Sequence, residues 1–200
     1  YINNILLVTN SLYEANDVYN RLLNYTNKVL FFPMDDFITS EVTDISPEFV
    51  IDRLTTLNKL LGSGKYIVVT NLMGILRYLP NTKLYKNKII DINKDMDIDR
   101  DDFINKLFDL GYEKKPVVSR TGEMAIRGYV IDIFPIEFDN PIRIEFWGDT
   151  IDSIKYFDLE NQISNTSIDS VKIYPYTEFL IDGKIEDNIT RKQKYLLNYS

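Results

Sequence analysis

Three short, continuous apolar runs in the first half of the chain constrain the fold most strongly. They lie at residues 4–9, 28–32 and 66–70, and such runs are typical of buried parallel strands. Residues 12–25 and 47–61 repeat apolar side chains at helical spacing, with Ser11 and Ser46 as candidate N-caps and Pro47 in a first turn. Asn71 is the candidate cap of a further short helix before Pro80. Strand, helix, strand, helix, strand predicts a parallel α/β sheet.

The pattern changes near residue 89, where the chain becomes β-rich. Short strands are predicted at 89–92 and 171–174, a helix at 100–110, and a three-stranded β-meander at 124–134, 142–147 and 150–157. Residues 186–200 have a helical pattern. We therefore predict an α/β plus α+β chain with an α/β unit at 1–88, a β-rich domain at 89–175 and a helical segment at 176–200 that begins the next subdomain.

Composition removes most catalytic chemistry. The chain has no Cys and no His, which excludes disulfides, thiolate nucleophiles, imidazole bases and the usual zinc sites. No Walker A phosphate loop is present, because the nearest string, at 62–65, follows a helix and precedes a strand. The acidic groups at 35–36 and 95–99 are best interpreted as solvated loops rather than metal sites. We expect no catalytic, nucleotide-binding or metal residues and no cofactor in this chain.

Charge and hydropathy limit the partners that the chain can have. The net charge is −7, and no basic stripe suggests a duplex-binding surface. No apolar run is long enough to span a membrane. The first residues contain neither an initiator Met nor a signal peptide, so we expect a segment of a longer protein.

The meander contains the most informative residues. Since alternate side chains in a strand point to opposite faces, Ile142, Ile144 and Phe146 are predicted to face the core. Arg143, Glu145 and Trp147 then share the other face. Arginine and tryptophan on one face are typical of binding hot spots. Strand parity alone leaves two readings of Trp147 equally open: an exposed anchor, or a core side chain folded over the strand end.

Two more residues of the meander stand out. Arg127 precedes Gly128 at the start of a neighbouring strand, and the glycine could form a bulge or a close approach that aims Arg127 outward. Asp132 lies inside a strand, where we expect a buried acid with a structural partner.

At these residues the sequence resembles a known family. The strings are GEMAIRGYVIDIFP at 122–135 and IRIEFWGDTIDSI at 142–154. Together they resemble a segment shared by the excision-repair protein UvrB and the transcription-repair coupling factors (Mfd). Only about a dozen residues separate Pro33 from Pro47, too few for the long hairpin of UvrB, and NLMGILRYLP at 71–80 is similar to the coupling factors. The chain is therefore identified as an N-terminal fragment of a coupling factor.

The resemblance implies a fold and a role. It implies that the α/β unit is a degenerate helicase-like (RecA-like) unit and that the β-rich domain recruits UvrA to stalled RNA polymerase in nucleotide excision repair of the transcribed strand. The UvrA-contacting positions of the family match Arg127, Arg143 and Trp147, the last being commonly Phe. The resemblance also implies a cytoplasmic bacterial protein. Its longer parent would be an ATP-dependent DNA translocase that uses ATP and Mg and contacts RNA polymerase and DNA through other parts.

Three alternatives stay open from the sequence. The chain could be a UvrB-type damage-recognition fragment, or its α/β unit could retain weak nucleotide or DNA binding. The segment could also serve mainly to mask other domains of the parent.

Overall fold

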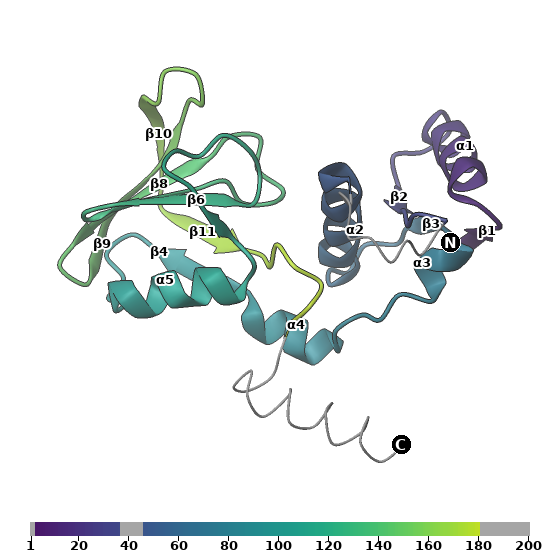
Figure 1. Ribbon diagram of the computed structural model, residues 1–200, viewed down its shortest axis with the longest axis horizontal. Helices are drawn as coiled ribbons and strands as arrows, with labels where there is room; N and C mark the ends of the chain where they lie inside the picture. Colours follow the sequence, from purple (N-terminus) through teal and green to yellow (C-terminus); the bar gives the residue numbers. More distant parts are fainter. Residues whose placement is uncertain (1–2, 37–45, 181–200) are drawn as a thin grey trace, which may run out of the picture.

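The computed structural model describes residues 3–36 and 46–180. Figure 1 shows two units joined through a short helix, with the α/β unit on the right and the β-rich unit on the left. The predicted helix at 186–200 lies outside the described residues. The predicted domain limits at 88 and 175 stay predictions.

The α/β unit contains a three-stranded parallel sheet in the order β1-β3-β2. Its strands are β1 (Ile5–Thr9), β2 (Val29–Phe32) and β3 (Ile67–Asn71), as the three apolar runs predicted. Helix α1 (Leu12–Leu23) packs on one face of the sheet and helix α2 (Pro47–Leu60) on the other. The helices bury β2 and most of the central strand β3, as expected for apolar runs. The expected burial of the first run is only partly correct, because Ile5 and Leu6 of the edge strand β1 are exposed.

The helix starts follow the predicted signals with one exception. The Ser11 hydroxyl accepts a hydrogen bond from the Glu14 N–H at the start of α1, and Asn71 caps α3 (Leu72–Ile75). Pro47 occupies the first turn of α2, but the Ser46 side chain makes no capping hydrogen bond. Helix α4 (Thr82–Lys88), which leads into the β-rich unit, was not predicted.

The β-rich unit has a six-stranded sheet in the order β10-β9-β8-β7-β6-β5. The strands are β5 (Glu113–Lys114), β6 (Glu123–Arg127), β7 (Val130–Ile133), β8 (Ile142–Trp147), β9 (Thr150–Phe157) and β10 (Ser164–Ile168). Helix α5 (Arg100–Asp109) and the antiparallel pair β4 (Ile90–Asn93) and β11 (Ser170–Ile173) pack against its inner face. The main core therefore lies between the sheet and this second layer.

The prediction of one strand at 124–134 is wrong. The segment forms two antiparallel strands, β6 and β7, in which Arg127 pairs with Val130 and the turn residues are Gly128 and Tyr129. Gly128 has φ of +57°, a conformation that glycine adopts without strain and that two-residue hairpins need. A signal was present in the sequence: inward apolar residues occupy even positions before Gly128 and odd positions after it, which a single strand cannot satisfy.

A small second core lies on the outer face of the sheet, at the end away from the β6–β7 turn. It consists of Val118, Ala125, Phe134 and Phe157, with Leu159 at its edge. The loop at 115–122 that covers it is held by the buried carboxylate of Glu123.

Glu123 accepts hydrogen bonds from the N–H and hydroxyl of Ser119, each at 2.8 Å, and from the Arg120 N–H at 3.1 Å. Burial acts to raise the pKa of Glu123, but these hydrogen bonds outweigh it, so the pKa lies below its ordinary value. The remainder of the outer face is open to solvent.

Candidate functional site

The open part of the outer face is organised around one buried carboxylate. Asp132 on β7 is 1% exposed. It accepts hydrogen bonds from Arg143 Nε at 2.7 Å and Nη2 at 3.0 Å, and it also pairs with Arg127 Nη2. The sheet register places Asp132 beside Arg143 on the adjacent strand, so three strands contribute to one ion cluster. The prediction of a buried acid with a structural partner is confirmed.

Arg143 is held inside the chain on every side. Its Nη1 donates to the Gln162 carbonyl at 3.1 Å and to the Ser164 hydroxyl at 3.3 Å. Its guanidinium carbon lies 4.6 Å from the centre of the Phe157 ring, and the side chain is 14% exposed. The hydrogen bond to Asp132 raises the pKa of Arg143, and the charges of Asp132 and Glu145 act in the same direction. Arg143 is therefore a fixed cation that orients Asp132 and the β9–β10 loop.

Arg127 is the more accessible cation of the pair, with a side chain that is 46% exposed. Beside it a shallow hollow of about 330 Å³ is lined by both arginines, Val130, Glu145 and Gln162. Glu145 is held by Lys155 Nζ at 2.7 Å and by the Ser153 hydroxyl at 2.5 Å. Hydrogen bonds from these two side chains lower the pKa of Glu145. Arg127 is therefore the charged side chain of the hollow that a partner protein can reach, while it remains paired with Asp132.

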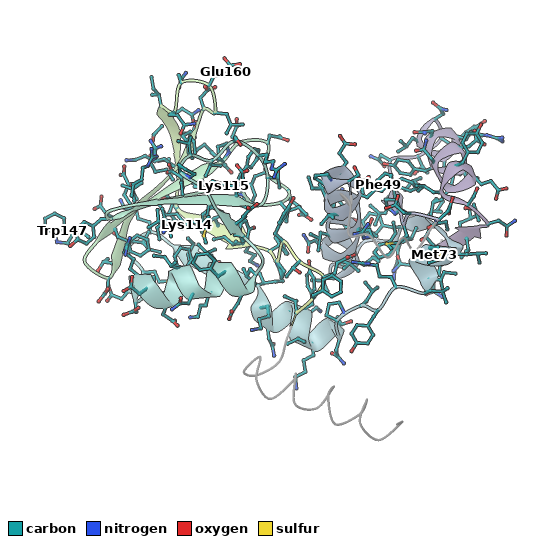
Figure 2. All side chains as sticks on the ribbon, in the orientation of Figure 1. Phe49, Met73, Lys114, Lys115, Trp147 and Glu160 are labelled. Atoms are coloured by element: carbon teal, nitrogen blue, oxygen red, sulfur yellow. The ribbon has the colours of Figure 1, made fainter. Side chains whose placement is uncertain are left out.

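Trp147 is the most accessible large side chain of this face. It is 82% exposed and lies at the tip of the β8–β9 hairpin, where it pairs with Thr150. Figure 2 shows the indole ring pointing away from the molecule at its outer end. Trp147 shares a face of β8 with Arg143 and Glu145, as strand parity predicted, so the reading as a folded-over core residue is wrong.

The structure thus brings the three predicted site residues to one face but gives them different surroundings. Arg127 and Arg143 share the carboxylate of Asp132, while Trp147 stands apart at the hairpin tip. Their contact with a partner stays a prediction. Gln162, Lys155 and Phe157 were not predicted to lie on this face. Gln162 lies in a loop between strands, and Lys155 and Phe157 lie on β9, where inward Ile151 and Ile154 interrupt the side-chain alternation.

The carboxyl edge of the parallel sheet is the position where α/β folds bind ligands. Here the chain fills that position itself. The Leu12 N–H at the start of α1 donates to both carboxylate oxygens of Asp36, at 2.8 and 2.9 Å, and Asn71 donates to the same group at 2.7 Å. A carboxylate therefore stands where a bound phosphate would meet the helix N-terminus, which disfavours residual nucleotide binding.

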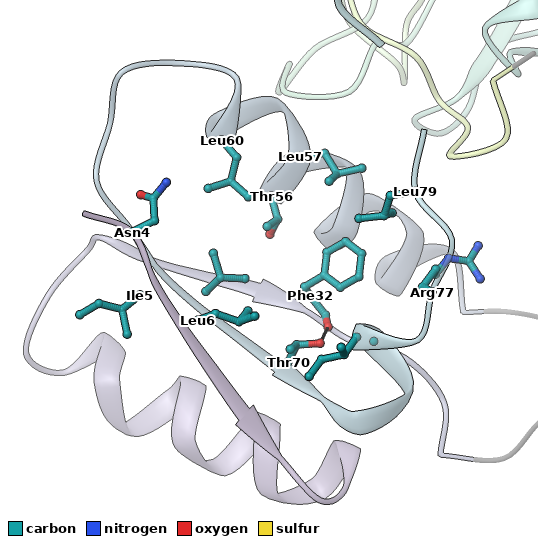
Figure 3. A pocket seen from close by; sticks show the side chains of 13 residues that line it. Asn4, Ile5, Leu6, Phe32, Thr56, Leu57, Leu60, Thr70, Arg77 and Leu79 are labelled. Carbon is teal, nitrogen blue, oxygen red and sulfur yellow. Dashed lines mark hydrogen bonds between the residues drawn. The ribbon is translucent and has the colours of Figure 1, made fainter. Parts of the chain in front are cut away.

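A second hollow, of about 380 Å³, lies on the α2 side of the same sheet and is shown in Figure 3. Its lining is mainly apolar, with Leu6, Phe32 and Leu57 among the residues that reach it. Arg77 at its rim is engaged by Glu178, and Thr70 donates to the Phe32 carbonyl. These groups are committed within the chain, so the hollow offers no evident phosphate chemistry.

Residues 3–36 and 46–180 offer neither a metal site nor a membrane-spanning helix. No group of three or more acidic, His or Cys side chains is arranged to hold a metal ion. None of the helices has the length and apolar character needed to cross a membrane.

An exposed tryptophan and a partly exposed arginine on one sheet face are the side chains that dominate protein-binding hot spots. The fold and the face together define a candidate protein-interaction domain.

Comparison with known proteins shows which proteins the chain is similar to. Residues 90–179 match the family model of the UvrB interaction domain. Over 198 residues, 98% of the chain, the sequence is 34% identical to the transcription-repair-coupling factor of Staphylococcus epidermidis. The corresponding factors of Staphylococcus haemolyticus and Staphylococcus aureus are each 34% identical over 192 residues.

The chain spans 17% of the length of the first of these proteins and 16% of the other two. It is therefore similar to one segment of the transcription-repair-coupling factors, and its residues 90–179 match a UvrB interaction domain. The resemblance inferred from the two strings at 122–135 and 142–154 is confirmed.

Proposed function

We propose that this chain is the UvrA-recruiting segment of a transcription-repair-coupling factor. Its β-rich unit binds UvrA through the outer face of β6 to β9 and so brings UvrA to stalled RNA polymerase during nucleotide excision repair of the transcribed strand. The observation that carries the proposal is the 82% exposure of Trp147 on a UvrB interaction domain. A large aromatic side chain left in water on a sheet face is costly for a monomer and useful for a complex.

The geometry gives the three residues separate roles. Trp147 supplies apolar area that becomes buried against UvrA. Arg127, with half its side chain accessible, pairs with a carboxylate or carbonyl group of the partner. Arg143 holds Asp132 and thereby Arg127 in place, so its contribution to docking is mainly indirect. The cluster is prepared before binding, which lowers the ordering cost on association.

The direct test is calorimetric titration of the chain with UvrA. Hot-spot truncations cost about 2 kcal/mol or more, so Trp147→Ala and Arg127→Ala are each expected to weaken binding about 30-fold. The matched control is Tyr13→Ala, because Tyr13 is 83% exposed on α1 of the other unit. Unchanged affinity in the double variant Arg127→Ala/Trp147→Ala assigns UvrA docking to another face.

We further propose a role for the longer protein to which the chain is similar. The α/β unit is a degenerate helicase-like unit, and the longer protein is an ATP-dependent DNA translocase of the bacterial cytoplasm that uses ATP and Mg. RNA polymerase and DNA are contacted by its other parts. The domain limits at 88 and 175 belong to the same proposal. Titration of this chain with ATP tests one consequence: saturable binding in the micromolar range contradicts the degenerate assignment.

A further inference from the structure

The two units are connected twice, and one of the connections ends in a buried ion cluster. The first connection runs through α4. The second is the segment at 174–180, which follows β11. Its first half is fixed to the β-rich unit, since the Tyr176 N–H donates to the Leu110 carbonyl at 2.7 Å and the Tyr112 hydroxyl donates to the Tyr174 carbonyl at 3.0 Å.

The second half of this segment is fixed to the α/β unit. Glu178 is 4% exposed. Its carboxylate accepts from Arg53 Nε at 2.8 Å and Nη2 at 3.2 Å, and from Arg77 Nε at 2.7 Å. Arg53 lies on α2 with its side chain 1% exposed, and Arg77 follows α3 with its side chain 13% exposed. We call these three residues the Glu178 cluster.

Further contacts complete the Glu178 cluster. Arg53 Nη1 donates to the Pro33 carbonyl at 3.0 Å, so the end of β2 is included. The Arg77 guanidinium lies 5.1 Å from the centre of the Phe179 ring, next in sequence to Glu178. The carboxylate thus joins two separate elements of the α/β unit to the end of the UvrB interaction domain.

A cluster of this kind acts on geometry more than on total stability. Buried ion pairs contribute little net stability over apolar packing, but they tolerate only one arrangement of their partners, because any displacement leaves a buried charge unpaired. Since Tyr174 and Tyr176 are hydrogen-bonded to one unit and Glu178 to the other, a rotation between the units is expected to break the cluster. Apolar contacts alone would allow sliding.

We propose that Glu178 is a positioning residue that fixes the orientation of the UvrB interaction domain, and hence of the face bearing Trp147, relative to the α/β unit. The direction in which a recruited UvrA is held then depends on a residue remote from the docking face. This functional meaning rests on the proposed docking of UvrA, whereas the fixed orientation does not.

The test is a distance measurement between the units that does not involve UvrA. The chain has no Cys, so one spin label can be attached in each unit through Tyr25→Cys and Thr166→Cys, both at exposed positions. Pulsed electron-electron double resonance then gives the distribution of distances between the labels. The parent is expected to show one narrow population. Glu178→Gln removes the charge shared by the two arginines and is expected to broaden the distribution or add a second population.

Controls separate loosening from unfolding. Asp17→Asn breaks the exposed pair between Asp17 and Arg21 on α1 and is expected to leave the distribution narrow. If Glu178→Gln unfolds the chain, the same distance measurement is made on Glu178→Asp. This variant retains the charge, but its shorter side chain reaches the two arginines less well. A broadened distribution in a variant with parental circular dichroism supports the proposal. A distribution as narrow as that of the parent overturns it, whatever the affinity for UvrA.

Discussion

Replacing Asp132 by Asn tests whether one buried carboxylate organises the outer face. Asn has nearly the shape of Asp, so the change removes charge without opening a cavity. The amide can accept from one guanidinium N–H, but its NH2 group meets the other donors. Arg143, which is 14% exposed, then remains mostly buried beside a neutral partner.

The expected cost follows from these burials. Stranding a buried charge costs about 3–5 kcal/mol, and a hydrogen bond to a charged group contributes about 1.5–3 kcal/mol. Arg127 is 46% exposed and regains water, which reduces its share. We therefore expect Asp132→Asn to lower the free energy of unfolding by about 2–3 kcal/mol. With a urea m-value of about 2 kcal/mol/M, the midpoint falls by about 1–1.5 M.

The assay is urea unfolding followed by far-UV circular dichroism. The fluorescence of Trp147 is unsuitable because that side chain is already 82% exposed in the folded state. Asp91→Asn is the matched control, since Asp91 forms an exposed pair with Lys172 at 3.7 Å, and it should change stability by less than about 0.5 kcal/mol. If the midpoint of Asp132→Asn equals that of this control, the carboxylate does not hold the arginines and the reasoning fails.

Four further outcomes are expected. Gly122→Ala should destabilise strongly, because Gly122 has φ of +88° and a Cβ would lie 2.1 Å from the Tyr176 ring; soluble yield and thermal melting report this. Gly128→Asn should cost little, because nothing lies within 4 Å of its Cβ position and Asn tolerates left-handed backbone. The pKa of Glu123 is lowered in the folded protein, so its carboxylate stabilises the fold at pH values above its ordinary pKa of 4.5. This stabilisation is lost as the pH falls through the folded pKa. Glu123→Gln should therefore make the free energy of unfolding depend less on pH in the acid range, as urea unfolding at several pH values would show. Asp36→Ala should lower stability by about 1–2 kcal/mol in urea unfolding, as the loss of a helix cap does, and a parental midpoint would contradict its role.

Local patterns in the sequence were sufficient for much of the fold. Continuous apolar runs place β1, β2 and β3, because strands of a parallel sheet covered by helices carry mostly apolar side chains. The exposure of Ile5 and Leu6 at the edge of the sheet could not be read from the run itself. Alternation in β8 assigns Ile144 inward and Arg143 outward, because side chains in a strand switch faces at every residue. The turn at Gly128 was missed even though the inward parity changes there. Helix α4 was not predicted because it is too short and too polar to give a periodic signal.

The sequence by itself determined the alternation of parallel strands and helices in the α/β unit, the face of β8 that Arg143 and Trp147 share, and the resemblance to the coupling factors. Only the tertiary structure decided which of these side chains is exposed to solvent. Trp147 is exposed because it lies on the outer face of β8, whose inner neighbour Phe146 is buried, whereas Arg143 is committed to Asp132 and to a loop about twenty residues further on. Glu178 and Arg53 are 125 positions apart. Pairing of charges over such separations depends on the closed fold, which no local pattern encodes.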